Sequence, residues 1–442
     1  MNETLTHPGA RPVATAGVAG FLRRHGAWLL TLAVALVLPW LFYDWSRARH
    51  SGFVVAMLSQ MSMMAIFALS YNMQMGQAGL LSFGHAVFFG LGGYCTAHVL
   101  NAVKDGMFWL PTELVPLAGG LGGLAFAMVF GYVATKQRAT AFAMITLGIG
   151  ELVTACALMF KTFFGGEGGV STNRMIGTSL FGLGYGPGIQ VYYLIVAWTV
   201  IAIVLMRLLT RTPLGSMANA CRDNYERAQF VGYDPSMVRF VQFTLSGFFA
   251  GIAGALYALT YEIVTFDAVA GAVSANALLM TYIGGVGAFA GPVLGAVLIT
   301  LLQSWVSLLS NSWLVYVGLL FILMVTFAPG GIAGIIAMHD PIWRSKRLGR
   351  LAIPYARVLA PGLLAVAGFV LLVELCSFLT IGAAQGKSFK LSGLTIDPQR
   401  PGSWLVGGAA LALGGLALWR EGRRFRAVWE SLMEGIKAAG RA

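Results

Sequence analysis

Apolar runs close to membrane-spanning length recur along almost the whole of this 442-residue chain, with short polar loops between them. About 20 apolar residues in a helix are enough to cross roughly 30 Å of hydrocarbon. Only 10% of the residues are charged, whereas soluble domains carry roughly 25%. The runs do not alternate as barrel strands do, and backbone groups in lipid must be paired within their own helix. The sequence therefore predicts an all-α, polytopic transmembrane helical bundle.

The runs predict about ten core spans and two further spans near the C-terminus. They cover residues 27–43, 53–72, 78–101, 113–134, 139–160, 189–210, 239–260, 270–286, 289–310, 313–336, 355–382 and 403–419. The run at 270–286 is short and rich in glycine, so crossing and re-entering on the same side both remain open for it. The first run follows Arg23 and Arg24, as in a signal peptide. It ends in the bulky stretch 39–43 where cleavage requires small residues, so we expect a retained helix.

Lysine and arginine near span ends mark the cytoplasmic side of a membrane protein. Clusters at residues 23–24, 136–138, 207–239, 344–350 and 420–426 all fall on one side when twelve crossings are counted. We therefore expect both termini in the cytoplasm of a bacterial inner-membrane protein; Arg47 and Arg49 disagree with this orientation. The same topology accounts for the net charge of +12, so nucleic acid is not an expected partner.

The longest charged stretch, residues 211–238, lies between two apolar runs. Within it, the pattern E-x-A-x-x-x-G at residues 226–232 predicts a short amphipathic helix closed by a glycine. A membrane protein has little reason to hold such a helix at its surface unless a soluble partner docks there. The alternative is an ordinary polar loop between helices, held in place by the positive-inside rule.

Several blocks of sequence, in the same order, resemble one family. They are GQAGLLSFGHA (76–86), TLGIGEL (146–152), a glycine pair (168–169), RTPLG (211–215), GFFAGIAGAL (247–256), GGVG (284–287), GPVLGA (291–296) and PGG (329–331). Together they resemble the permease subunits of branched-chain amino acid ABC importers of the LivM/LivH type, and the TLGIGEL block is closer to LivM. The resemblance covers about residues 28–337.

This resemblance implies that the 211–238 loop couples the chain to an ATPase. The coupling residues would be Arg222, Asp223, Tyr225, Glu226, Arg227, Ala228 and Gly232. The implied partners are a homologous second permease subunit, two cytoplasmic ATP-binding subunits, a periplasmic substrate-binding protein and membrane lipid. The implied cargo is a branched-chain or related hydrophobic amino acid, with urea and aromatic acids left open. Homodimer and heterodimer both remain open as well.

We expect no enzymatic activity, cofactor or metal in this chain. Residues 382–388 resemble a nucleotide-binding loop, but three residues separate the first glycine from Gly-Lys where the Walker pattern requires four. The four cysteines are scattered and contain no C-x-x-C pair, so neither a zinc site nor a disulfide framework is expected. ATP hydrolysis would belong to partner subunits.

Four polar residues within the apolar runs are candidates for the substrate pathway: Gln77, Ser82, His85 and Glu151. The first three lie at an expected helix start, where free N–H groups favour a carboxylate. Close packing of small residues, with His85 held by structural hydrogen bonds, is the competing interpretation. An acid within a membrane span is costly, so Glu151 either faces the pathway or pairs with another helix.

Two other functional classes remain open at this point. An ion-coupled secondary transporter would use Glu151, His85 and Glu374 as carriers, with broken helices at matched positions of its two halves. A membrane scaffold would dock partners on the basic tail.

The sequence divides into four parts. They are a cytoplasmic N-terminal segment (1–26), a permease transmembrane domain (27–337), an extension with two spans (338–420) and a basic cytoplasmic tail (421–442). For the tail, an amphipathic helix on anionic lipid and a solvated end are both open.

Overall fold

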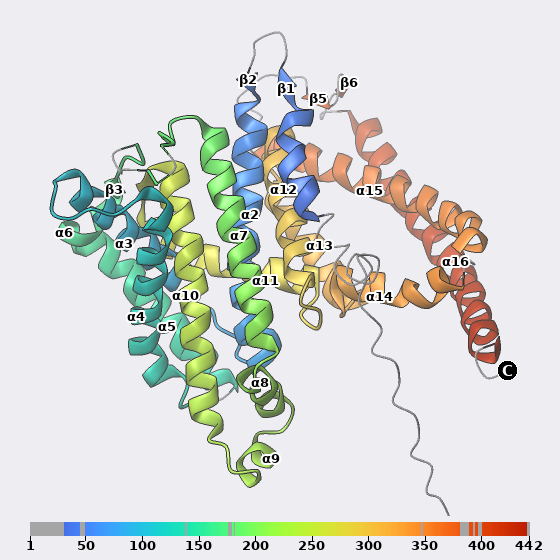
Figure 1. Cartoon of the computed structure of the whole chain (residues 1–442). Helices are drawn as coiled ribbons and strands as arrows, with labels where there is room; N and C mark the ends of the chain where they lie inside the picture. Colours follow the sequence, from blue (N-terminus) through green and yellow to red (C-terminus); the bar gives the residue numbers. More distant parts are fainter. Residues whose placement is uncertain are drawn as a thin grey trace, which may run out of the picture.

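The computed structural model describes residues 31–44, 49–137, 139–175, 179–180, 182–345, 348–380, 389–391, 394–396 and 400–439. Helices dominate these residues (Figure 1). Nine of them are long and apolar enough to cross a membrane, or ten if a bent pair counts as one span. The predicted polytopic helical fold is confirmed. Of the expected first span, the described part contains only the short apolar helix Thr31–Leu41.

Four helices form the centre of the bundle: α2 (Gly52–Asn72), α3 (Ala86–Lys104), α4 (Val115–Ala134) and α10 (Pro235–Tyr261). A π-helical turn, η1 (Met73–Gln77), extends α2. Glycines allow these helices to approach closely, because a Cβ at Gly254 would overlap the carbonyl oxygen of Phe89 and one at Gly251 would overlap that of Gly119. The GFFAGIAGAL block is therefore a packing surface.

The surrounding helices complete the bundle. They are α5 (Ala139–Met159), α6 (Lys161–Phe164), α7 (Gly188–Thr210), α8 (Pro213–Asp223), α9 (Tyr225–Phe230), α11 (Gly271–Gly284), α12 (Gly291–Leu309), α13 (Trp313–Phe327) and α14 (Gly331–Arg344). Helix α11, which lies across the bundle in Figure 1, has 14 residues. At 1.5 Å per residue it is about 21 Å long, too short for a full crossing. The expected span at 313–336 is bent by 45° between α13 and α14.

Short elements connect the helices. They are the strands β1 (Tyr43–Asp44), β2 (Arg49–His50), β3 (Val170–Ser171), β4 (Ile263–Val264), β5 (Phe389–Leu391) and β6 (Leu394–Ile396), and the 3₁₀ turns η2 (Thr112–Leu114), η3 (Gly166–Gly168), η4 (Phe266–Val269) and η5 (Leu348–Leu351). The strands form three antiparallel pairs, β1–β2, β3–β4 and β5–β6.

Two further helices, α15 (Ala352–Thr380) and α16 (Pro401–Ala439), pack against each other beside the bundle (Figure 1). Helix α16 passes through the boundary expected at residue 420 without a break, because no proline follows Pro401. The last turns of α16 pack part of their apolar side against the protein itself. Leu432 and Trp429 pack with Ile342 of α14 and Leu351 of η5. Residues 440–442 lie outside the described part.

The bundle has one end that carries α8 and α9, which we call the α8–α9 end. Helices α2 and α7 finish there and α10 begins there, and Nη2 of the buried Arg239 donates to the carbonyl oxygen of Gln137 at 2.6 Å. Residue 49 lies in β2, at the opposite end (Figure 1). The expected clusters at 23–24 and at Lys346 and Arg347 fall outside the described residues.

Candidate functional site

The charged loop folds into two helices, α8 and α9. Pro213 begins α8, where its missing N–H costs nothing. Asn224 separates the helices, and its side-chain oxygen accepts a hydrogen bond from the backbone N–H of Arg227 at 2.9 Å, which caps α9. The chain leaves the helix at Gly232, whose φ of +91° favours glycine. The short helix closed by a glycine is therefore present, and α8 is an addition that the sequence did not indicate.

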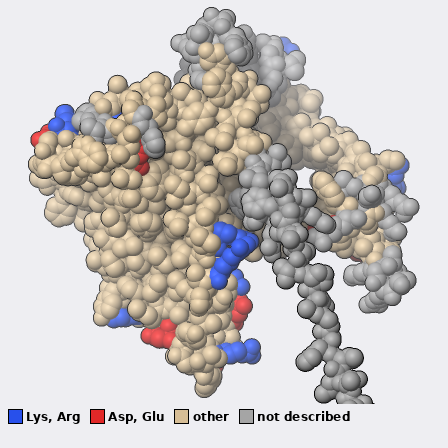
Figure 2. Space-filling model, viewed as in Figure 1, with Lys and Arg blue, Asp and Glu red and all other residues tan. Residues whose placement is uncertain are grey.

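We call α8 and α9 together the α8–α9 elbow. Its tip exposes apolar side chains among charged ones. Phe230 is 89% exposed and Val231 is 69% exposed. Asp223, Glu226 and Arg227 are exposed as well, whereas Ala228 is buried and Tyr225 is half-buried. Figure 2 shows acidic and basic side chains gathered toward this end of the molecule. Exposed apolar groups rimmed by charges are typical of a protein contact surface. The predicted coupling set omits both Phe230 and Val231.

Arg222 joins α8 to the interior of the bundle. Its Nη1 donates to the carbonyl oxygen of Gly76 in the π-helical turn, and its Nε donates to Asp223 at 3.0 Å. Gly79, with φ of +67°, lies against the Arg222 side chain. The adjacent Gln77 accepts a hydrogen bond from Gln242 of α10 at 2.7 Å. These contacts connect α8 to the segment between α2 and α3 and, through Gln77, to α10.

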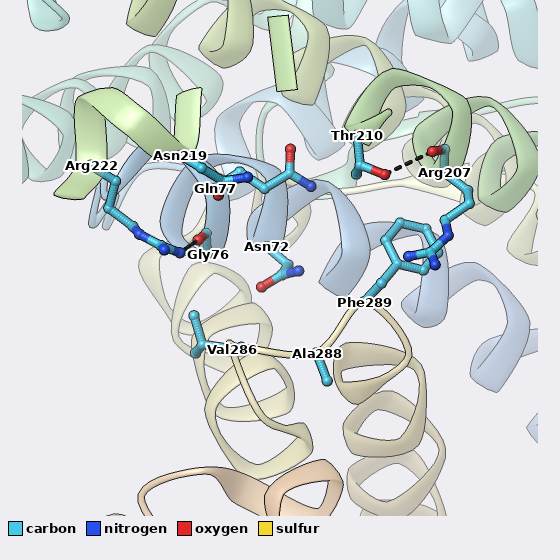
Figure 3. Close-up of a pocket in the computed structure, with 11 residues that line it drawn as sticks. Asn72, Gly76, Gln77, Arg207, Thr210, Asn219, Arg222, Val286, Ala288 and Phe289 are labelled. Carbon is cyan, nitrogen blue, oxygen red and sulfur yellow. Dashed lines mark hydrogen bonds between the residues drawn. The ribbon is translucent and has the colours of Figure 1, made fainter. Parts of the chain in front are cut away.

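A cavity of about 340 Å³ opens beside this link. It is lined by Asn72, Gly76, Gln77, Arg207, Thr210, Asn219, Arg222, Val286, Gly287, Ala288 and Phe289. Figure 3 shows these residues arriving from the end of α2, from α7 and α8, and from the loop between α11 and α12. The Arg207 guanidinium lies 4.9 Å from the centre of the Phe289 ring. Of the four predicted pathway residues, only Gln77 lines this cavity.

His85 lies elsewhere, fully buried between α2, α3 and α10. Its Nδ1 is 3.1 Å from the Gln74 amide nitrogen, which can only donate. Nε2 therefore carries the proton and donates to the Ser70 hydroxyl at 2.9 Å, which in turn donates to the Phe67 carbonyl oxygen. Both ring nitrogens are engaged within the core, which is the arrangement that the structural interpretation of this histidine expects.

The start of α3 does not offer free N–H groups to a carboxylate either. The N–H of Ala86 donates to the Ser274 hydroxyl at 2.8 Å, and the N–H of Phe83 donates to the Thr146 hydroxyl at 3.2 Å. Ser82 is buried, and its carbonyl oxygen accepts from the Tyr71 hydroxyl. Residues distant in sequence satisfy this helix start, so Ser82 belongs to the packed core.

The two acids within helices have different surroundings. Glu151 is exposed on the outer side of α5, along with Met144 and Leu152. It does not point into the interior of this chain. Glu374 of α15 is buried and accepts a hydrogen bond from the Tyr316 hydroxyl of α13 at 2.6 Å. This bond ties the C-terminal helices to the bundle.

A second buried acid, Glu113, is absent from the sequence prediction. It lies at the end of the bundle opposite α8 and α9, and its carboxylate accepts hydrogen bonds from the hydroxyl groups of Ser179 and Tyr185 at 2.7 and 3.0 Å. Burial and this bond raise the pKa of Tyr185 to about 12. Asn72 and Arg207 of the cavity were also missed, because the segments that line the cavity are far apart in sequence.

Several known transport permeases are similar to this chain in sequence. LivM, the high-affinity branched-chain amino acid transport permease of Escherichia coli K12, is 28% identical over 288 residues, which cover 60% of this chain and 67% of LivM. BraD of Pseudomonas aeruginosa is 24% identical over 283 residues, covering 61% and 91% of the two chains. The fructose import permease FruF of Bifidobacterium longum is 27% identical over 269 residues, covering 57% and 70%.

No solved structure matches the chain. The family described as branched-chain amino acid transport system, permease component, matches residues 53–328, more than half of the sequence. The matched region contains α2 to α13, including the α8–α9 elbow, and ends before α15 and α16. The chain is therefore a multi-pass membrane permease that belongs to the branched-chain amino acid transport permease family.

Proposed function

We propose that this permease is moved by cytoplasmic ATP-hydrolysing subunits that dock on α8 and α9. The observation that carries this proposal is the elbow itself. Its exposed Phe230 and Val231 form a contact surface, and Arg222 connects that surface to Gly76 in the bundle. An ATP-binding subunit docked on this tip would be connected to the membrane helices through Arg222 and Gly76.

The route leads to a segment suited to bending. The π-helical turn η1 ends at Gln77, and the chain is not helical again until α3. Gly79 provides a left-handed backbone conformation in this stretch. Movement of α8 would pull on Gly76 through Arg222 and reach α10 through Gln77 and Gln242. Opening and closing of the path would follow from this rocking of helices.

A homologous second permease would cover the outer side of α5. Glu151 lies there in the middle of a helix, with Met144, Leu147 and Leu152 exposed around it. A carboxylate facing hydrocarbon is costly. A second subunit against this side would remove Glu151 from lipid and give it polar partners at the seam, along which cargo would pass. The substrate-binding protein would meet the opposite end of the bundle, near β3 and β4.

The proposed cargo is a branched-chain or related hydrophobic amino acid, after the names of LivM and BraD. FruF is named for fructose, so the names of the relatives do not agree on one class of cargo. If the ATP-binding subunits dock on α8 and α9, these helices face the cytoplasm of a bacterial cell. The end of α16 lies on the same side of the molecule (Figure 1).

The ion-coupled alternative has less support. A secondary transporter needs titrating groups along an interior path. His85 has both ring nitrogens in hydrogen bonds within the core, and Glu151 is on the outer side of α5. The buried Glu374 lies in α15, outside the region that the family shares.

Cysteine cross-linking tests the docking. Glu226→Cys on α9 is expected to cross-link to a co-expressed ATP-binding subunit, whereas Glu167→Cys, exposed in η3 at the opposite end, is not. The native Cys221 is buried, and burial raises the pKa of its thiol. We therefore expect little cross-linking through Cys221 itself. Cys376 is exposed and is first replaced by alanine. A complex that co-purifies yet cross-links only through Glu167→Cys would overturn the proposal.

A further inference from the structure

The cavity at the α8–α9 end differs from the packed core in its charge. Two guanidinium groups, those of Arg207 and Arg222, line it, and no carboxylate is among the described lining residues. Arg222 already faces Asp223, at 2.9 Å. Arg207 forms no ion pair with any described carboxylate and contacts the ring of Phe289. The cavity therefore presents an uncompensated cation to whatever enters it.

One buried acceptor on the cavity wall is also unsatisfied. Asn72 is 4% exposed, and its side-chain oxygen has no hydrogen-bond partner among the described residues. In Figure 3 the Asn72 amide lies between Gly76 and Phe289, within the ring of lining residues. Buried polar groups in native proteins nearly always have a partner. A ligand that carries a hydrogen-bond donor would supply the hydrogen bond that the Asn72 oxygen lacks.

The third feature of the cavity is an apolar wall. Val286, Ala288 and Phe289 come from the loop between α11 and α12 and face the polar residues of α2, α7 and α8 (Figure 3). The volume of about 340 Å³ is at the lower end of the range for small-molecule sites, roughly 300–1,000 Å³. Cation, acceptor and apolar wall together match a small molecule with a carboxylate, an ammonium group and an aliphatic side chain.

We propose that this cavity binds a free aliphatic amino acid from the side of the membrane that α8 and α9 face. Its carboxylate pairs with Arg207, its ammonium group donates to the Asn72 oxygen, and its side chain packs on the loop 286–289. This inference rests on the proposed function, since it assigns the cavity to cargo that leaves on the inner side. The occupant sits between the elbow and the α11–α12 loop, so accumulated cargo would slow the cycle from within.

The test is binding of L-leucine to the purified full-length chain in lipid nanodiscs, by calorimetry. Leucinamide lacks the carboxylate and 4-methylpentanoate lacks the ammonium group, and each is expected to bind at least tenfold more weakly than leucine. Arg207→Gln is expected to weaken leucine binding by the same factor. The matched control, Arg211→Gln, changes an exposed arginine outside the cavity and is expected to leave it unchanged.

A second variant guards against a folding defect. Asn219→Asp is isosteric and places a negative charge on the cavity wall, so it should weaken binding of leucine while leaving thermal stability as in the parent. Absence of leucine binding to the parent chain, or equal affinity for leucinamide, would overturn the carboxylate site. Equal affinity for 4-methylpentanoate would overturn the role of Asn72.

The assay contains no ATP-binding subunit, so it fails independently of the proposed function. If the parent chain does not bind leucine but Glu226→Cys still cross-links, only the proposal for the cavity is contradicted. Retained binding without any cross-link to an ATP-binding subunit removes only the coupling.

Discussion

The His85 cluster and the cavity at Arg207 are two polar regions of one bundle, and both adjoin the end of α2. In the first, Gln74 and Ser70 engage both nitrogens of a fully buried ring. In the second, Arg207 contacts an aromatic ring but no described carboxylate, and the Asn72 oxygen has no hydrogen-bond partner among the described residues. The first region is thus a packed and hydrogen-bonded cluster, whereas the second is the binding site that we propose.

The largest effect expected from this comparison is on stability. His85→Ala leaves the Gln74 amide without its acceptor and opens a void, which should cost about 3 kcal/mol of unfolding free energy. Arg207→Gln, in the cavity, should change it by less than about 0.5 kcal/mol. Unfolding in mixed micelles measures both. Equal stability of the two variants would erase the distinction between the regions.

The next effect concerns assembly at the elbow. Phe230→Ser removes the most exposed aromatic group of α9 and should weaken binding of the ATP-binding subunits by about 2 kcal/mol, the size typical of an interface hot spot. Met107→Ser, an exposed residue at the opposite end, is the control. Both variants should fold as the parent does. Pull-down at graded subunit concentrations measures the loss, and unaltered assembly of Phe230→Ser would place the contact elsewhere.

A smaller effect is expected where the elbow meets the bundle. Arg222→Ala removes a charged hydrogen bond to Gly76, so uptake per ATP hydrolysed should fall about tenfold, equivalent to about 1.4 kcal/mol. Assembly with the ATP-binding subunits should persist, and Arg222→Lys should restore part of the coupling. Parallel assays of uptake and ATP hydrolysis test this. A proportional loss of both activities would show that Arg222 acts in docking instead.

The smallest effect is at Gly232. Its φ of +91° disfavours any residue with a Cβ, although no atom lies within 4 Å of the space that a Cβ would fill. Gly232→Ala should therefore cost about 1 kcal/mol, confined to the end of α9. Hydrogen exchange of residues 225–233 is expected to quicken while exchange in α10 stays the same. Unchanged exchange in α9 would mean that this glycine is not needed to close the helix.

The sequence predicts a helix well where an apolar run of membrane-spanning length is bounded by polar residues. Expected spans at 53–72 and 189–210 correspond to α2 (Gly52–Asn72) and α7 (Gly188–Thr210) within one residue. It fails where helix-breaking residues lie inside an apolar run, because hydropathy does not register them. The break between α13 and α14 occurs at Pro329 and Gly330, within a run that hydropathy reads as continuous.

Site residues were harder to predict than helices. The elbow could be found because its charges stand out in an apolar chain. The roles of His85 and Glu151 could not, because periodicity does not say which side of a helix faces the interior. The partners of His85 include Gln74, eleven residues away, which also donates to Ser246, 172 residues from it. Such pairs exist only after folding.

We propose that ATP hydrolysis in partner subunits drives this permease through its α8–α9 elbow. The most direct measurement is uptake of radiolabelled leucine into proteoliposomes that contain the complete complex, with the substrate-binding protein outside. The account predicts uptake that requires ATP on the α8–α9 side, survives collapse of ion gradients, and is lost in Phe230→Ser. Uptake driven by a proton or sodium gradient in vesicles without the ATP-binding subunits would contradict it.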